Sequence, residues 1–446
     1  DEEYDLICLG TDPRVGILSA VLQQKGMKVL TLDKESYYGG QGASVSLTDL
    51  YKRFRPESPE VPKFLGDARY WSVDLCPKFL MSGGNLVKLL RSTGVTRYLD
   101  FLLVSGSYVA NGGKIHKVPA SAGEALATPL LGFFEKRRFK NFLQWVDNYD
   151  FSNPSTWEGV DVKKTTTREV FAGRSLGDDA VEFTGHAIAL HQNDDYLNQP
   201  AADTVKKCKL YADSLARFGS SPFIYPKYGL GGIPEGFSRL CAVAGGVQML
   251  EKKIEELVYE DGKIVGVKVE GTVIKTKMVL ADPTYMLTLE PTKVKQNGSI
   301  IRSIVLMQHA VPNTSNADSL QLIIPAKQLK RKNDIYVTVV SSQQAVAADG
   351  WYIAVVSTIL EGPEANAQNE IKAAYEFLGG SIRENFTWVA PYLVPVADGA
   401  DNVFVTSSMD PTSHFEVATD EVLSLFKKIT GSDIDLDKLP DNDDDM

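Results

Sequence analysis

The stretch Tyr4-Asp5-Leu6-Ile7-Cys8-Leu9-Gly10-Thr11-Asp12-Pro13 decides the fold of this chain, together with the apolar run from Met27 to Leu32 and the Asp33 that ends it. The first run is short and apolar, as in a buried strand, and Gly10 ends it. Asp12-Pro13 then opens an amphipathic helix, because Asp is a preferred N-cap and Pro a preferred first helical residue. Strand, glycine turn, helix and strand, with an acid about twenty residues past the first glycine, predict a dinucleotide-binding βαβ unit.

The phosphate-binding turn of this unit departs from the usual pattern. The fingerprint Gly-x-Gly-x-x-Gly needs glycines at positions 10, 12 and 15, whereas the chain has Gly10, Asp12 and Val15. Asp12 places a carboxylate at the helix N-terminus, whose free N–H groups and dipole would otherwise hold a phosphate. We therefore predict a dinucleotide-binding architecture that has lost its dinucleotide and uses no cofactor.

Length and charge limit the functions to consider. The 446 residues allow two or three domains, and the net charge of -10 argues against nucleic acid or an anionic membrane surface as the main partner. No window approaches eighteen uninterrupted apolar residues. The cysteines are far apart and form no CxxC pair, which favours a reduced, cytosolic protein; they are Cys8, Cys76, Cys208 and Cys241.

Hydrophobic periodicity predicts an α/β pattern over most of the chain, with an aspartate-rich and disordered tail after Ser432. Met278 to Pro283 resembles a last strand that rejoins the doubly wound sheet. Helices are predicted at 48–54, 85–99, 234–244, 371–377 and 419–429. A hairpin is predicted at 102–118 with its turn at Asn111-Gly112-Gly113, and further strands at 254–280, 301–307, 320–324, 335–340 and 352–358.

Between about Ala120 and Phe218 the pattern is helical, which predicts a second, smaller domain. Its apolar stripes are more typical of a core than of a lipid groove, and the pattern leaves both open. The stripes are Phe139, Phe142, Leu143 and Val146; Phe183, His186, Ala187 and Leu190; and Val205, Cys208, Ala212 and Leu215.

Catalytic signatures are missing from the sequence. There is no Gly-x-Ser-x-Gly elbow and no Walker loop. His186 and His191 are five residues apart, which does not place them on one helix face as zinc ligands, and His186 is expected to be a packed, hydrogen-bonded side chain. The chain is therefore expected not to be an enzyme, although the βαβ unit and Asp33 keep a FAD-dependent oxidoreductase as an alternative.

A set of short motifs extends from about Tyr4 to the last helix. The motifs are 37–40 (YYGG), 73–75 (VDL), 77–81 (PKFLM), 95–101 (VTRYLDF), 134–138 (FEKRR), 183–187 (FTGHA), 194–197 (DDYL), 225–231 (YPKYGLG) and 313–314 (NT). Taken together, they resemble the Rab GDP dissociation inhibitor family, which is related to the Rab escort proteins.

This resemblance implies a doubly wound, FAD/NAD(P)-binding-like large domain, similar to flavin monooxygenases with a degenerate flavin site. The large Rab-binding domain would comprise residues 1–118 and 219–446, and residues 119–218 would form an all-helical, prenyl-binding domain. The implied function is to bind GDP-loaded, geranylgeranylated Rab GTPases as a monomer in a 1:1 complex, to slow GDP release, and to extract them from membranes into the cytosol. An escort-type adaptor for prenylation is the other alternative.

Site residues follow from the resemblance by position. The Rab-binding platform would comprise Tyr38, Arg69, Gly232, Glu235, Arg239, Val247, Gln248 and Met249. A mobile loop would comprise Arg217, Phe218, Gly219, Ser220 and Ser221, and prenyl contacts would come from Phe134, Phe142, Leu143, Phe183, Ala187, Leu210 and Leu215. The chain departs from the family's usual residues at Asp12, Ser220, Gly232, Ala244, Val247 and Gln248. No catalytic or metal-binding residue is implied.

Overall fold

The computed structural model describes residues 3–120, 124, 128–396 and 399–437, so the tail from residue 438 on lies outside the described part. Its central layer is a five-stranded parallel sheet with the order β11-β3-β2-β15-β21. The strands are β2 (Leu6–Leu9), β3 (Val29–Leu32), β11 (Val247–Met249), β15 (Val279–Ala281) and β21 (Val403–Val405). The predicted strands at the start of the chain are confirmed, and β15 does rejoin β2, with β21 beyond it.

Helix α1 (Pro13–Gln24) begins where the sequence predicts. Gly10 before it has a φ of +98°, and a Cβ at this position would lie 3.0 Å from Tyr285, so the turn requires glycine. The prediction that α1 is amphipathic is wrong, because every residue from Pro13 to Leu22 is buried. Helices α9 (Gly232–Val243) and α13 (Glu416–Thr430) both pack against α1 and cover it.

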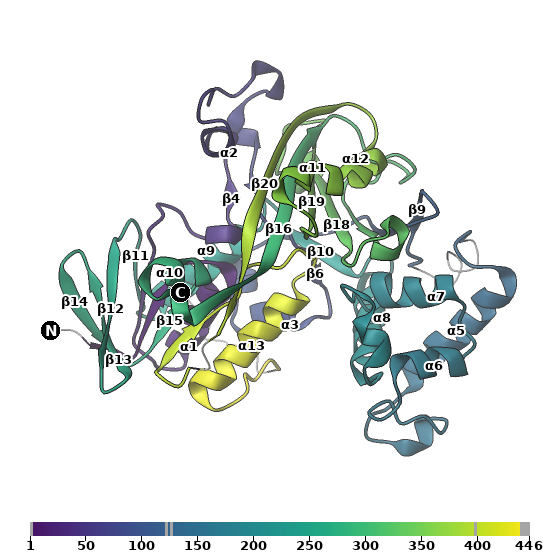
Figure 1. The fold of residues 1–446 in the computed structure, drawn as a ribbon, viewed down its shortest axis with the longest axis horizontal. Coiled ribbons are helices and arrows are strands. Elements are labelled where there is room, and N and C mark those ends of the chain that lie inside the picture. Colours follow the sequence, from purple (N-terminus) through teal and green to yellow (C-terminus); the bar gives the residue numbers. More distant parts are fainter. Residues whose placement is uncertain (1–2, 121–123, 125–127, 397–398, 438–446) are drawn as a thin grey trace.

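A seven-stranded sheet stands beside the parallel one, with the order β20-β16-β19-β18-β17-β8-β9. Its longest members are the antiparallel pair β16 (Val294–Met307) and β20 (Ile382–Pro395), which cross the middle of the molecule in Figure 1. The others are β8 (Gly106–Asn111), β9 (Lys114–Lys117), β17 (Leu320–Ile324), β18 (Ile335–Ser341) and β19 (Tyr352–Ile359). Strand β20 was not predicted, because its apolar residues are interspersed with polar ones and most of them are only partly buried.

Two sequence predictions about local structure need correction. The helix predicted at 85–99 ends at Ser92 as α3 (Asn85–Ser92), because Gly94 adopts a φ of +76° and a 3₁₀ turn, η4 (Val95–Tyr98), follows. The hairpin predicted at 102–118 is confirmed only for β8 and β9. Residues 101–103 instead form β7 (Phe101–Leu103), which pairs with β10 (Phe223–Pro226) in a small sheet that also holds β6 (Leu80–Met81).

The helical part gathers at one side of the molecule in Figure 1, away from the meander of β12 (Ile254–Glu260), β13 (Lys263–Val269) and β14 (Thr272–Thr276). It comprises α5 (Phe133–Asn148), α6 (Thr167–Gly173), α7 (Asp178–Glu182), the π-helix η6 (Phe183–Ile188) and α8 (Ala202–Phe218). We call these elements the helical part; the domain boundaries at 118 and 219 stay a prediction.

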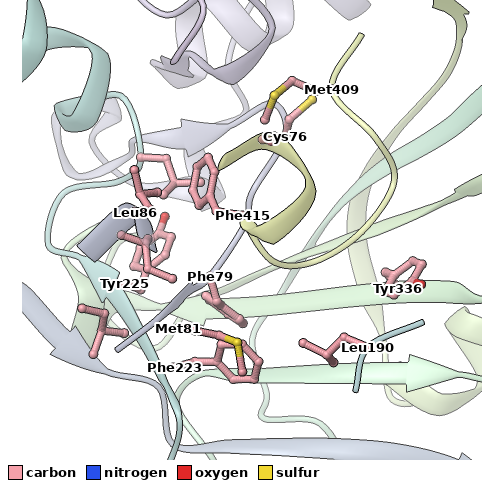
Figure 2. Close-up of a cluster of buried hydrophobic side chains, with 14 of the residues drawn as sticks. Cys76, Phe79, Met81, Leu86, Leu190, Phe223, Tyr225, Tyr336, Met409 and Phe415 are labelled. Carbon is pink, nitrogen blue, oxygen red and sulfur yellow. The ribbon is translucent and has the colours of Figure 1, made fainter. Parts of the chain in front are cut away.

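One continuous hydrophobic core joins the helical part to the rest. Figure 2 shows part of it around Phe79, Phe223 and Tyr225. Phe183 and Ala187 of the helical part, and Leu190 shortly after η6, belong to the same cluster. The rings of Phe79 and Tyr225 meet edge to face with centroids 5.8 Å apart. Among the described residues, no helix is both long and apolar enough to cross a bilayer.

The remaining elements are short. They include β1 (Glu3–Tyr4), β4 (Ser44–Val45), β5 (Val73–Asp74), α2 (Leu47–Phe54), η3 (Ala68–Tyr70), α10 (Pro283–Leu289), η9 (Ala326–Leu329), α11 (Ala367–Glu370) and α12 (Lys372–Leu378). The predicted helices at 48–54, 234–244, 371–377 and 419–429 correspond to α2, α9, α12 and α13.

Candidate functional site

The N-terminus of α1 already carries its own carboxylate. The Asp12 side chain caps the helix by accepting the N–H of Arg14 at 3.1 Å. The Arg14 guanidinium donates to Asp12 Oδ2 at 2.7 Å and to Glu421 Oε2 at 2.9 Å, and Arg14 and Asp12 are almost fully buried. A buried ion pair therefore stands where a dinucleotide fold would place its pyrophosphate.

The carboxylate that would hold a ribose is also fully engaged. Asp33 Oδ1 accepts the Tyr285 hydroxyl at 2.8 Å and the Glu35 N–H at 3.0 Å, while Oδ2 accepts the Thr11 hydroxyl at 2.6 Å. Burial, together with the nearby Asp12, raises the pKa of Asp282 beside this site to about 6.

The cavity left at this site has a volume of about 200 Å³, below the ~300–1,000 Å³ of typical small-molecule pockets. Its lining carries four carboxylates, from Asp12, Asp33, Glu35 and Asp282, against two cations, Lys34 and Arg53, and this excess of negative charge disfavours a pyrophosphate. These residues do not fit FAD, so the βαβ unit here supports no flavin chemistry. Within the described residues, no group of His, Cys, Asp or Glu is arranged to hold a metal ion.

Helix α9 presents two of the predicted platform residues to solvent. Glu235 and Arg239 are exposed on it, and the Arg239 guanidinium lies 4.5 Å from the ring centroid of Tyr98 in η4. Tyr38 is half-buried; burial, and then the neighbouring Glu235 carboxylate, raise the pKa of its hydroxyl. The structure thus brings Tyr38, Glu235 and Arg239 to one surface, which we call the α9 surface.

Strand β11, at the edge of the parallel sheet, carries three further predicted residues. Val247 and Gln248 are partly exposed, and the Gln248 amide donates to the carbonyl of Ser238 in α9 at 3.0 Å. Met249 is 40% exposed. Since α9 and β11 are in contact, these residues continue the α9 surface.

The other two predicted platform residues differ in their setting. Gly232 begins α9, and a Cβ there would lie 2.9 Å from a methyl group of Leu99, so a larger residue would have to displace that flexible side chain. Arg69 lies on a separate segment, η3, where it pairs with the exposed Asp67 at 2.9 Å.

A buried carboxylate fixes the loop that leads into α9. Asp74 accepts the N–H of Leu230 at 3.0 Å and the hydroxyls of Ser44 and Tyr225, both at 2.5 Å. The Ser44 hydroxyl also accepts the N–H of Gly231 at 2.7 Å. Burial raises the pKa of Asp74 to about 6 despite these hydrogen bonds. Sequence reasoning used Asp74 only as part of a motif, although an acid inside an apolar strand could have indicated such a role.

A groove between η4 and the end of α8 was missed by the sequence reasoning. Its volume is about 250 Å³, its floor is mostly apolar, and two arginines line it. The lining residues are Ser82, Val87, Leu90, Arg91, Thr96, Phe101, Arg217, Phe218 and Ile224. Thr96 of η4 and Phe218 of α8 both line it, so this groove adjoins the helical part and an element that packs on α9. Phe101 and Arg217 belong to stretches that the sequence singled out, but only the fold brings them together.

The predicted mobile loop overlaps the end of α8. Arg217 and Phe218 are the last residues of α8, and Gly219 ends the helix with a φ of +75°. Ser221 is 1% exposed, and its hydroxyl accepts the N–H of Phe223 at 3.2 Å. Only Gly219 and Ser220 remain as an exposed link, with the 56%-exposed ring of Phe218 beside it.

Three of the seven predicted prenyl-binding residues, Phe142, Phe183 and Ala187, are buried in the packed core of the helical part. Phe142 contacts Phe171 with ring centroids 5.5 Å apart, and Phe183 contacts Phe139 at 5.6 Å. Ala187 is fully buried, whereas Leu143, Leu210 and Leu215 are partly exposed at the edge of this cluster. The side chain of Phe134 lies outside the described part of the structure.

His186 joins the helical part to the seven-stranded sheet. Its Nδ1 bonds to Asp334 Oδ2 at 2.6 Å, just before β18, and its Nε2 bonds to Asp194 Oδ1 at 3.0 Å. Both ring nitrogens therefore donate, as in an imidazolium. Burial lowers the pKa of His186, but the hydrogen bonds to Asp194 and Asp334 outweigh it and raise the pKa to about 10. The prediction of a packed, hydrogen-bonded histidine is confirmed.

Comparison with known proteins gives concordant results. Residues 1–441 match the family model described as GDP dissociation inhibitor. The chain is 47% identical to the Rab GDP dissociation inhibitor beta of Rattus norvegicus, over 98% of this chain and 97% of that protein. The crystal structure of a Rab GDI from Plasmodium falciparum superposes with a TM-score of 0.92 and 44% identity, over 97% of this chain and 99% of that one.

A more distant match concerns the fold alone. The crystal structure of an oxidoreductase from Methanosarcina mazei superposes with a TM-score of 0.62 at 14% identity, over 96% of this chain and 100% of that one. The overall architecture is thus shared with a protein named for redox chemistry, while the residues at the α1 turn differ from what a dinucleotide needs.

Proposed function

The chain belongs to the GDP dissociation inhibitor family, and we infer from this membership that it binds Rab GTPases and inhibits the release of their GDP. The single observation that carries this function is the 47% identity to a Rab GDP dissociation inhibitor over nearly the full length of both proteins. The chain is accordingly a regulator of GTPases and not an enzyme. Its site is a set of protein-binding surfaces.

We propose that the partner is the GDP-loaded, geranylgeranylated form of a Rab, bound in a 1:1 complex. Inhibition then follows from linkage. A protein that binds the GDP-loaded state more tightly than the empty state strengthens the hold of the Rab on GDP by the same factor. No chemical step by the chain is needed.

The α9 surface is the proposed docking site for the GTPase domain. Tyr38, Arg239 and Met249 combine an aromatic ring, a guanidinium and a thioether, which are side chains enriched at protein interfaces. Arg239 is already oriented by Tyr98. The Asp74 network holds the N-terminal end of α9 in place, so docking would require little reordering of this loop.

The groove lined by Arg91, Phe101 and Phe218 is the proposed path for the flexible tail of the Rab. It has an apolar floor for apolar side chains of the tail and two arginines for backbone carbonyls or acidic groups. It also adjoins the helical part, where the lipid is proposed to go.

The helical part is the proposed shelter for the prenyl chain. A buried methylene is worth about 0.8 kcal/mol, so a twenty-carbon chain in water costs on the order of 10 kcal/mol. Phe142 and Ala187 are fully buried in this structure, so the helices must separate for the chain to enter. The partly exposed Leu143, Leu210 and Leu215 mark the edge at which entry is expected. A complex with the lipid enclosed would travel through the cytosol and contact membranes transiently.

Extraction from liposomes tests this function. Geranylgeranylated, GDP-loaded Rab is bound to liposomes, the protein is added, and soluble Rab is measured after sedimentation. We expect the wild type to solubilise the Rab, and Arg239→Ala to weaken binding about tenfold. Arg168→Ala, at an exposed arginine of the helical part bonded to Asn198, is the matched control. Failure of the wild type to release any Rab would contradict the proposal.

A further inference from the structure

Three exposed aromatic side chains lie outside the α9 surface, on short segments that hydrogen bonds and ring contacts join to one another. Phe64 is 45% exposed, Tyr70 53% and Tyr228 62%. In the part of the chain that the structure describes, Phe218 is the only other exposed aromatic residue. We call the set Phe64, Tyr70 and Tyr228 the aromatic ridge.

Each ring of the ridge lies beside a cation. The Arg383 guanidinium is 4.9 Å from the ring centroid of Phe64, and the Arg69 guanidinium is 5.0 Å from that of Tyr70. The Lys227 ammonium is 5.1 Å from the centroid of Tyr228. These contacts orient the rings before any partner arrives, which lowers the entropy lost on binding.

The loops that carry the ridge are fixed to one another. The Ser72 hydroxyl donates to the carbonyl of Tyr228 at 2.8 Å, and the Ser72 N–H donates to the carbonyl of Val346 at 3.0 Å. The N–H of Tyr228 donates to the buried Gln344 carbonyl at 3.0 Å. One short segment thus ties the loop of Tyr228 to the loop that follows Ser341.

Aromatic stacking fixes the remaining loop. Phe64 stacks on the buried ring of Trp351 with centroids 6.2 Å apart, and Trp71 meets Trp351 edge to face at 5.5 Å. The Trp71 indole N–H donates to the carbonyl of Leu65 at 3.1 Å. The ridge is therefore a rigid surface rather than a set of independent loops.

Tyr228 is held in an unfavourable conformation. Its φ is +73°, in the left-handed region that a bulky residue rarely adopts. Such a conformation persists where the surroundings fix it, and it clusters at functional positions. Here the two backbone hydrogen bonds to Ser72 and Gln344 fix the conformation and leave the ring exposed.

The ridge is continuous with the α9 surface. Tyr228 precedes Gly232, the first residue of α9, by four positions, and the loop between them is held by Asp74 and Ser44. Tyr70 directly follows Arg69, which the sequence places in the platform. A globular partner seated on α9 would thus extend over the ridge.

We propose that the aromatic ridge is a second contact for the GDP-loaded Rab and determines which Rabs bind well. The inference rests on the proposed function. Three oriented rings, rimmed by Arg69, Arg383 and Lys227, fit an apolar patch flanked by carboxylates on the partner. Rabs that differ in this patch differ in affinity, while the α9 surface supplies the contact common to all of them.

The test measures the affinity of several prenylated, GDP-loaded Rabs for the wild type and for Phe64→Ala, Tyr70→Ala and Tyr228→Asn. Asn removes the ring of Tyr228 but tolerates its φ. We expect each variant to bind at least one Rab tenfold or more weakly, by factors that differ between Rabs. Val273→Ala and Leu287→Ala remove side chains that are 49% and 45% exposed on β14 and α10, and serve as matched controls with unchanged affinity.

The binding results distinguish a failure of the ridge proposal from a failure of the proposed function. Wild-type binding with all three ridge variants within twofold of it, and with unchanged circular dichroism, overturns the ridge while leaving the proposed function intact. Absence of wild-type binding to every Rab overturns both. Sedimentation of the protein alone adds a third outcome, since self-association that the ridge variants abolish would assign the ridge to a second copy of the chain. Tyr70→Ala keeps the test valid if Phe64→Ala disturbs Trp351, because among the described residues the hydrogen-bond partner of the Tyr70 hydroxyl is the exposed Arg69.

Discussion

Arg14 and His186 are both buried cations held between two carboxylates, but they serve regions of different kinds. Arg14 lies in the βαβ unit between Asp12 at 2.7 Å and Glu421 at 2.9 Å. His186 lies in the helical part, between Asp334 at 2.6 Å and Asp194 at 3.0 Å. The first ion pair fills a nucleotide site, and the second joins the helical part to a sheet.

The two cations differ in whether they can lose their positive charge. A guanidinium stays protonated at every pH a protein meets, so the α1 turn remains closed to a pyrophosphate. An imidazolium can lose its proton, and it does so here only at alkaline pH, because its carboxylate partners raise its pKa to about 10. Arg14, whose charge is permanent, thus lies where a nucleotide is excluded. His186, whose charge can be lost, lies between the helical part and the seven-stranded sheet, which the proposed lipid uptake would move relative to each other.

Removing the permanent cation has the largest expected effect. Arg14→Leu leaves the buried Asp12 and Asp282 carboxylates without their cation, and breaking a buried pair in this way costs about 3–5 kcal/mol. Urea unfolding measures the loss. Arg168→Leu, at an exposed site, should change stability by less than about 0.5 kcal/mol. A loss for Arg14→Leu as small as that of the control would show that this ion pair does not stabilise the α1 turn.

A double variant sharpens this result. Asp12→Asn combined with Arg14→Leu removes the cation and the carboxylate nearest to it, so the double loss should fall short of the sum of the single losses by at least about 1 kcal/mol. The same unfolding experiment provides all four free energies. Additive losses would mean that Asp12 and Arg14 act independently, contrary to the contact between them.

Removing the titratable cation is expected to cost slightly less. His186→Gln should lower the free energy of unfolding by about 3 kcal/mol at pH 7, since it leaves Asp334 buried beside Asp194 without a cation. The folded pKa of His186, about 10, lies above the unfolded value of ~6.5. Its stabilisation is therefore complete below pH ~6.5 and is lost as the pH rises through 10.

The gap in stability between wild type and His186→Gln should consequently narrow between pH 7 and pH 9.5. His191→Gln is the matched control. Burial lowers the pKa of His191 to about 3, so this histidine is neutral throughout that range and its replacement adds no slope. If the stability difference between wild type and His186→Gln stayed constant from pH 7 to pH 9.5, His186 would not be a titrating cation, and it would not differ from Arg14 in the way described.

The smallest effect is expected at the exposed end of the His186 contact. The Asp194 side chain is 62% exposed, so water replaces much of what Asp194→Asn removes, and the loss should be about 1 kcal/mol. Adding salt should reduce the difference between Asp194→Asn and the wild type. If Asp194→Asn lowered the free energy of unfolding as much as His186→Gln does, Asp194 and not the buried Asp334 would be the main stabilising partner of His186.

The fold was predictable where the local pattern is strong. The short runs around β2 and β3, and Asp12-Pro13 as the start of α1, specify the βαβ unit because cap, turn and apolar spacing all agree. The end of α3 was missed because one left-handed glycine, Gly94, outweighed the apolar period around it. Strand β20 was missed because it is only partly buried.

Some of the candidate site residues were likewise predictable from the sequence, and others were not. The family resemblance predicted Tyr38, Glu235 and Arg239 as platform residues, and the structure brings them together on one surface. The groove at Phe101 and Phe218 joins residues more than a hundred positions apart. Glu421, one of the two partners of Arg14, and Asp334, one of the two partners of His186, are also more than a hundred positions away in sequence. No local pattern reports such contacts, since they exist only after the chain has folded.

Release of a fluorescent GDP analogue from a geranylgeranylated Rab, with and without this protein, shows most directly whether the protein keeps GDP bound to the Rab. We expect slower release in its presence, saturating at one protein per Rab, and a weaker effect for Arg239→Ala. Unchanged release by a protein with intact circular dichroism would contradict the proposed function, because a folded chain of this family would then fail to stabilise the GDP-loaded state.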